Sequence, residues 1–209
     1  MTNKIKVAVA GVGSCASALI QGVQWYIDNP EESVGIGHRD VGGYDITDME
    51  FVVAFDVDAR KVGKPLREAI YSKPNCNMRV VNSVNDVVPE HATVVRGPTL
   101  DGIAPHMRDY PEDVTFVEDT EIEPVGGEEY KNILNFYEVD VLLNYVPVGS
   151  DEAAKFYIEN AVKAGVHVIN CMPSYIATED ARELEQLAID HGVTLVMSDM
   201  RSSWGACLS

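Results

Sequence analysis

Short apolar runs rich in valine and isoleucine alternate along the chain with longer amphipathic segments, and this alternation narrows the possible folds more than any other feature. The runs are continuously apolar, which is typical of strands buried on both faces of a sheet. The predicted strands are residues 5–10, 51–55, 93–95, 141–146, 167–170 and 194–197. The predicted helices are residues 14–27, 59–71, 128–137, 151–164 and 179–191. This order predicts an α/β fold with a doubly wound, mostly parallel sheet and helices on both faces.

Two segments interrupt the alternation. Residues 28–50 contain four glycines, and residues 109–129 carry nine acidic residues with no Lys or Arg. We interpret both as insertions in loops. An acidic run is usually a solvated surface, and a partner-binding surface is the alternative for the second insertion.

Two of the predicted helices begin with residues that favour helix N-termini. Ser150 precedes two acidic residues, and Thr178 likewise precedes two acidic residues. A hydroxyl oxygen can accept a hydrogen bond from the first free amides of a helix, and acids favour its positive end. The sequence therefore predicts side-chain caps from Ser150 and Thr178.

Charge and cysteine content restrict the classes of function. Sixteen basic against 33 acidic residues give a formal net charge of −17, so nucleic acid and anionic membranes are not expected partners. Whether this acidity reflects a high-salt habitat stays open. The N-terminus lacks the pattern of a signal peptide and no run is long enough to cross a membrane, which predicts a cytoplasmic location. Four cysteines in no metal-binding spacing predict no metal site.

A glycine turn follows the first predicted strand directly. Residues 11–16 read G-x-G-x-x-A and open the next helix. Gly11 would permit the tight turn, Gly13 would let a pyrophosphate approach the backbone, and Ala16 would allow close helix packing. The strand before the turn and the helix after it supply the context that this dinucleotide-binding motif requires. We therefore interpret residues 1–209 as one Rossmann-like NAD(P)-binding domain with insertions near 28–50 and 109–129.

An acidic residue at the end of the second long strand would bind the ribose hydroxyls of such a cofactor, and Asp56 stands there. It follows Gly13 by 43 residues instead of the usual ~20, and the insertion at 28–50 accounts for the excess. A carboxylate favours NAD over NADP, whereas Arg60 nearby keeps NADP open. The alternative is that Asp56 and Asp58 only cap the following helix.

Three later strand ends should face the same ligand, because ligands of open α/β sheets bind at the carboxyl ends of strands. They are residues 144–150, 170–173 and 198–202. Ordinary strand-to-helix turns are the alternative interpretation. None of the five histidines is assigned a catalytic role, and Cys171 at a strand end is more typical of a small core residue. The catalytic residues therefore stay unknown.

Several strings are more specific than a glycine turn. They are residues 9–17, 54–63, 96–102, 139–142, 147–153 and 169–173. With them the chain resembles the N-terminal, NAD-binding part of the prokaryotic inositol-3-phosphate synthase family, also called myo-inositol-1-phosphate synthases.

The resemblance implies an NAD-dependent isomerase that converts glucose 6-phosphate to inositol 3-phosphate by oxidation, aldol cyclisation and reduction, in inositol and phospholipid biosynthesis. It implies that the pyrophosphate lies against Gly11, Gly13, Ser14 and Cys15, and the ribose against Asp56. It places Pro147 and Asn170 at the nicotinamide and Asp199 with Ser202 at the junction with the substrate site. Where the family carries a lysine, this chain has Arg201, which stays protonated.

The family continues into a C-terminal catalytic and tetramerisation domain that this chain lacks. We therefore expect a truncated or split enzyme that works as a homo-oligomer or with a complementary catalytic half. Two alternatives stay open: a stand-alone NAD-binding module with a regulatory or scaffolding role, and a small NAD-dependent dehydrogenase of another substrate.

Overall fold

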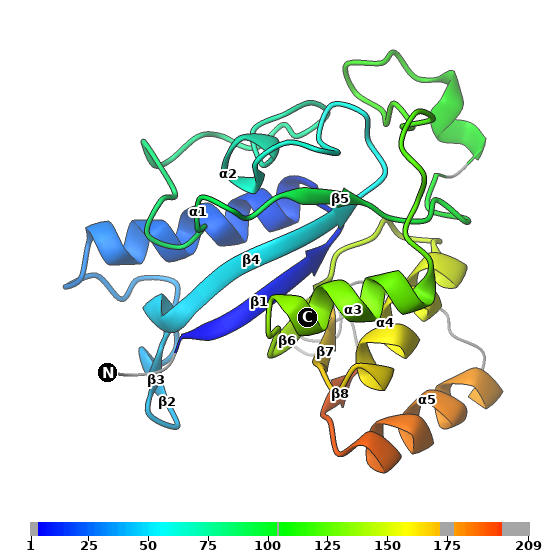
Figure 1. The fold of residues 1–209 in the computed structure, drawn as a ribbon. Coiled ribbons are helices and arrows are strands. Elements are labelled where there is room, and N and C mark those ends of the chain that lie inside the picture. Colours follow the sequence, from blue (N-terminus) through cyan, green and yellow to red (C-terminus); the bar gives the residue numbers. More distant parts are fainter. Residues whose placement is uncertain (1–3, 104, 172–177, 198–209) are drawn as a thin grey trace, which may run out of the picture.

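One six-stranded parallel sheet organises the chain (Figure 1). The computed structural model describes residues 4–103, 105–171 and 178–197. The strands are β1 (Ile5–Ala10), β4 (Met49–Asp56), β5 (Val94–Arg96), β6 (Val141–Asn144), β7 (His167–Asn170) and β8 (Leu195–Val196). Their spatial order is β5-β4-β1-β6-β7-β8, and every neighbouring pair is parallel. This is the strand order of a doubly wound, Rossmann-like sheet, so the predicted fold class is confirmed.

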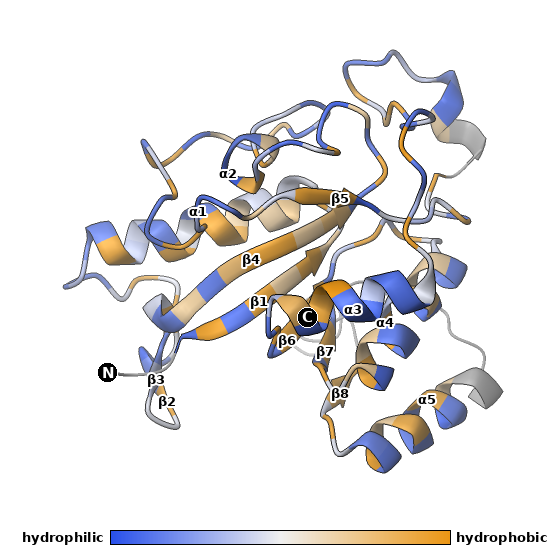
Figure 2. Ribbon diagram, viewed as in Figure 1, coloured by the Kyte–Doolittle hydropathy of each residue, from blue (hydrophilic) through white to orange (hydrophobic). Residues whose placement is uncertain are grey.

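Helices cover both faces of this sheet. They are α1 (Ser14–Asp28), α2 (Leu66–Ala69), α3 (Gly127–Phe136), α4 (Asp151–Lys163) and α5 (Thr178–His191). Figure 1 shows α1 and α2 on one face and α3, α4 and α5 on the other. Side chains of β1 alternate between the two layers: Val7 and Val9 pack with the α1 layer, and Ala8 and Ala10 with the opposite one. The apolar strands between mixed-polarity helices in Figure 2 reflect this burial. No helix of the described residues is long and apolar enough to cross a membrane.

The structure corrects one predicted helix. Residues 59–71 form a helix only at Leu66–Ala69. Gly63 adopts a positive φ of 75°, which a continuous helix does not permit. Its N–H donates to the carbonyl of Val94, and the N–H of Val94 donates to the carbonyl of Lys64. This stretch therefore uses its backbone hydrogen bonds on the edge of β5 and not within a helix.

The first insertion has some structure of its own. Strands β2 (Asp40–Val41) and β3 (Tyr44–Asp45) form a small hairpin outside the main sheet, followed by the short helix η1 (Ile46–Asp48). Asp45 caps η1 and also pairs with Arg39 at 2.8 Å. The hairpin lengthens the connection from α1 to β4.

The cap of α4 comes from a different residue than predicted. Ser150 is the N-cap residue, but its side chain makes no capping hydrogen bond. The carboxylate of Asp101, about fifty residues earlier, instead accepts from the N–H groups of Glu152 and Ala153, both at 2.9 Å. The side chain of Thr178, the other predicted cap, lies outside the described residues. Asp101 thereby ties the loop after β5 to the first turn of α4.

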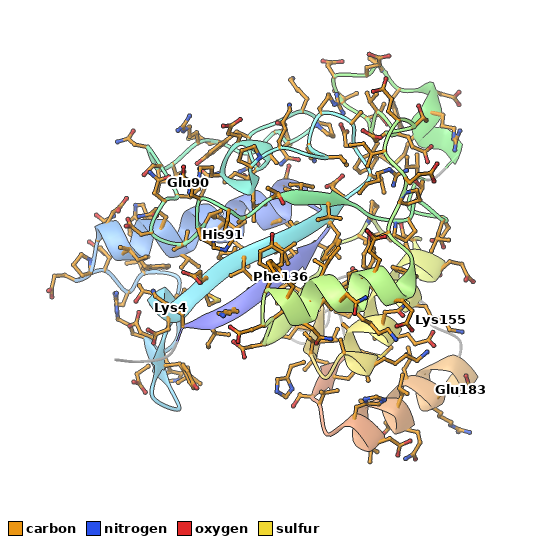
Figure 3. All side chains as sticks on the ribbon, viewed as in Figure 1. Lys4, Glu90, His91, Phe136, Lys155 and Glu183 are labelled. Atoms are coloured by element: carbon orange, nitrogen blue, oxygen red, sulfur yellow. The ribbon has the colours of Figure 1, made fainter. Side chains whose placement is uncertain are left out.

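Replacing this cap should lower stability. We expect Asp101→Ala to reduce the free energy of unfolding by about 1 kcal/mol, because two amides at a helix N-terminus lose a charged acceptor. Urea unfolding measures the change. Glu90→Ala is the control, because it removes an exposed carboxylate from the loop before β5 (Figure 3). Equal stability of the two variants would contradict the assigned role of Asp101.

Candidate functional site

A pocket opens at the carboxyl ends of the central strands. This is where the strand order reverses on the two sides of β1, the position at which open α/β sheets bind ligands. Four of the nine residues predicted for the site line it: Gly11, Gly13, Asp56 and Pro147. The other lining residues are Phe55, Val57, Pro98, Thr99, Gly102, Phe116, Tyr145, Val146, Ala153 and Tyr157.

The two glycines of the turn have different physical reasons for lacking a side chain. A Cβ on Gly11 would lie 2.7 Å from the carbonyl oxygen of Tyr145, and the residue has a φ of 88°. Gly11 is thus required by the protein itself, where β1 and β6 approach each other. Among the described residues, a Cβ on Gly13 would meet no atom within 4 Å beyond its two chain neighbours. The space beside Gly13 is therefore open for a ligand.

The N-terminus of α1 is suited to an anion. Gly13 is its N-cap residue, no side chain caps it, and no acidic residue lies in its first turn. Free amides and the helix dipole together attract phosphate groups. Ser14 begins the helix, and its hydroxyl accepts a hydrogen bond from the N–H of Cys76 at 3.2 Å. Cys15 is exposed at the same end.

Asp56 holds the turn together from the end of β4. One oxygen of its carboxylate accepts from the amide of Val12 at 2.7 Å. The other accepts from the amides of Val57 and Asp58, at 2.7 and 2.9 Å. The residue is only 5% exposed. Because α2 does not begin until Leu66, Asp56 and Asp58 do not cap a helix, and that alternative is wrong.

Lys61 is a buried lysine that the sequence pattern does not indicate, because lysines are rarely buried. Its Nζ donates to the carbonyl of Val12 at 2.8 Å and to the side chain of Asn75 at 3.0 Å, and lies 3.9 Å from Asp56. Burial lowers the pKa of Lys61, while the carboxylates of Asp56 and Asp58 act in the opposite direction. Lys61 therefore links the glycine turn, Asp56 and the loop of Asn75.

The acidic segment 109–129 is not a free loop. The amide of Ala59 donates to the carbonyl of Val117, and the amide of Asp119 donates to the carbonyl of Val57, both at 2.8 Å. These bonds fix the segment against the turn that follows Asp56. As a result Phe116 forms part of the pocket wall.

Arg96 belongs to one of the strings that carry the resemblance, and its side chain binds the middle of the acidic segment. Its guanidinium donates to the carbonyl of Asp119 at 3.1 Å and to the hydroxyl of Thr99 at 2.7 Å. It also lies 3.5 Å from Glu118. Arg96 thus joins the end of β5 to two parts of the pocket wall, a role that its position in a string could not reveal.

Asn170 and Cys171 lie at the carboxyl end of β7, and Tyr145 directly follows β6. Asn170, at the end of β7, is buried, accepts a hydrogen bond from Asn144 at 3.0 Å and is not among the residues that line the pocket. Tyr145 lines the pocket, and burial raises the pKa of its phenol. Burial likewise raises the pKa of Cys171, as expected for a thiol that is not activated. Asp199, Ser202 and Arg201 lie outside the described residues. The described residues contain no group of three or more side chains that could hold a metal ion.

Comparison with known proteins identifies relatives over the whole chain. An inositol-3-phosphate synthase of Mycolicibacterium smegmatis is 42% identical over 99% of this chain, and one of Corynebacterium glutamicum is 40% identical over 100% of it. The chain is a homologue of the inositol-3-phosphate synthases. It spans about half the length of these relatives, 53% and 54% respectively. No model of a known protein family matches it.

Solved structures share the fold of this chain. The structure described as Ari2 superposes with a TM-score of 0.74 and 28% identity over 94% of this chain and 52% of its own. A myo-inositol-1-phosphate synthase-related protein of Thermotoga maritima shares the fold, with a TM-score of 0.66 and 21% identity over 94% of this chain and 55% of its own.

Proposed function

We propose that this chain forms the NAD-binding part of an inositol-3-phosphate synthase. The observation that carries the proposal is the combination of an uncapped helix N-terminus with open space beside Gly13, at the point where the strand order reverses. Both features favour the pyrophosphate of a dinucleotide. The 42% identity to a synthase supports the same family of ligands.

The described residues would contact three parts of NAD: the pyrophosphate, a ribose and the nicotinamide. The amides at the start of α1, including those of Ser14 and Cys15, would bind the pyrophosphate. The Asp56 oxygen that accepts only from Val12 has a further lone pair for a ribose hydroxyl. Pro147, in the pocket wall beyond β6, would border the nicotinamide, with Asn170 supporting that wall through Asn144. Bound NAD would accept a hydride from the sugar and later return it.

We propose glucose 6-phosphate as the substrate of the whole enzyme, with Asp199 and Ser202 at the junction with its site. Catalysis would then require residues that the relatives carry in the half not matched by this chain, supplied as a longer chain, a complementary half or a homo-oligomer. Assay of this chain alone for conversion of glucose 6-phosphate with NAD tests this point. Turnover by the isolated chain would overturn it.

The test of the cofactor site is Gly13→Ala. A methyl group there meets no further atom in the part of the chain that the structure describes, so the free energy of unfolding should stay within about 0.5 kcal/mol of the original. The same methyl would occupy the space proposed for the pyrophosphate, so affinity for NAD should fall at least about tenfold. Calorimetric titration and urea unfolding measure the two quantities.

Gly22→Ala is the matched control, because its added methyl also meets no protein atom but lies further along α1. It should bind NAD normally. If Gly13→Ala bound NAD as tightly as Gly22→Ala, the pyrophosphate could not lie beside Gly13.

A further inference from the structure

We infer that the ion pair of Asp58 with Arg60 determines the selection of NAD over NADP. Residues 109–123 of the acidic segment hold this ion pair in place. This inference rests on the proposed NAD site. It assigns specificity to residues beyond Asp56, whose carboxylate is already engaged by backbone amides. It also gives a role to the acidic segment.

Arg60 is a basic side chain shortly after Asp56, at a position along the chain that suits a 2′-phosphate. In the structure, however, the guanidinium of Arg60 is bound by other protein groups. Its Nε and Nη2 donate to the carboxylate of Asp58 at 2.8 and 2.5 Å, a bidentate pair in which Asp58 is fully buried. Two further bonds, at 2.5 and 2.6 Å, go to the carbonyls of Glu112 and Thr115. Four hydrogen bonds therefore hold this guanidinium, two to Asp58 and two to carbonyls of the acidic segment.

The acidic segment cannot easily release Arg60, because it is fastened on both sides. Asp58 also accepts from the amide of Val117 at 3.2 Å and forms an isolated bridge with Glu118. Phe116, between these contacts, lines the same pocket as Asp56 and Val57. The clamp on Arg60 and the wall of the cofactor pocket are thus one structural unit.

The negative charge of this structural unit disfavours the binding of NADP. Residues 109–123 carry seven carboxylates and no Lys or Arg. A 2′-phosphate brings about two negative charges and needs a cation able to turn toward it. Here the cation is neutralised by Asp58, and further carboxylates stand beside it. NAD, which has a hydroxyl at that position, meets no such repulsion.

Calorimetric titration of the full chain with NAD and NADP tests the inference. Asp58→Asn keeps the shape of the side chain and leaves Arg60 with an unbalanced positive charge. The ratio of NADP affinity to NAD affinity should rise about tenfold, because one unpaired cation then faces the phosphate. Adding Arg60→Ala to this variant should abolish the gain, which a merely structural role of Asp58 would not predict.

A second variant guards against misfolding of Asp58→Asn. Glu112→Gln with Asp113→Asn neutralises two exposed carboxylates, and the affinity ratio should shift about threefold toward NADP at low salt. High salt should weaken discrimination by the original chain in the same direction, because the Debye length falls from about 30 Å at 0.01 M to about 3 Å at 1 M.

The outcomes separate the two proposals. If the original chain binds neither nucleotide, the proposed cofactor site is wrong. Suppose instead that it binds NAD, and that the ratio of NADP to NAD affinity is the same in the Glu112→Gln, Asp113→Asn variant and at high salt. Then only the inference about specificity is overturned. The same holds if Asp58→Asn folds and its ratio does not change.

Discussion

Lys61→Met should destabilise the fold by about 3–5 kcal/mol, the usual cost of removing one member of a buried charged pair. Lys61 is fully buried and donates to Val12 and Asn75. Its loss leaves the carboxylate of Asp56 without the buried positive charge at 3.9 Å and the side-chain oxygen of Asn75 without this donor, while the carbonyl of Val12 keeps the hydrogen bond from the Asn75 amide. Urea unfolding followed by circular dichroism measures the change.

Lys64→Met is the control for this experiment. Lys64 is exposed and lies three residues away on the same turn, so its replacement should change the free energy of unfolding by less than about 0.5 kcal/mol. A Lys61→Met variant as stable as Lys64→Met would mean that the buried amino group contributes nothing to the fold. Methionine has a similar length, so loss of packing would not explain a large effect.

Gly11→Ala should have the second large effect. The positive φ costs a non-glycine residue about 1–3 kcal/mol, and the new methyl would lie 2.7 Å from a backbone oxygen of Tyr145. A backbone oxygen cannot rotate away as the end of a side chain can. The backbone after β6 must therefore shift as a whole, at a further cost of about 1–3 kcal/mol. Thermal unfolding should therefore show a much lower midpoint than for the original chain.

The contrast with Gly13→Ala makes this result informative. One glycine of the turn should control stability and the other should control binding, although they are two residues apart. If both variants unfolded at the same temperature, the assignment of Gly11 to the protein and of Gly13 to the ligand would fail. Gly22→Ala again serves as control, with a gain of about 0.5–1 kcal/mol expected for alanine within a helix.

The sequence predicted the sheet well because continuous apolar runs have few alternatives to a covered parallel sheet. The helix expected at residues 59–71 was wrong because its amphipathic pattern ignores the pairing of Gly63 and Lys64 with Val94, a contact distant in sequence. The same limitation hid Asp101 as the cap of α4. Long-range hydrogen bonds of this kind leave no periodic signal along the chain.

The candidate site was predictable in part for a similar reason. The glycine turn and Asp56 follow local rules, because the turn directly follows the first predicted strand and Asp56 directly follows the second. Lys61 and Phe116 belong to the site through tertiary contacts, and so does the hold of residues 112 and 115 on Arg60. In a sequence, lysines and acidic segments both indicate surface positions. The contacts in the structure show that Lys61 is buried and that the acidic segment forms part of the pocket wall.

The central place of β1 has a consequence for how the protein is made. This strand pairs on one side with β4 and on the other with β6, and the amide of Lys6 donates to Asp140, 134 residues later. Residues as late as Tyr157 complete the pocket. During synthesis the first strand must therefore wait for most of the chain before its second edge is covered. A ligand of this pocket therefore cannot stabilise the nascent chain until these later residues have been made.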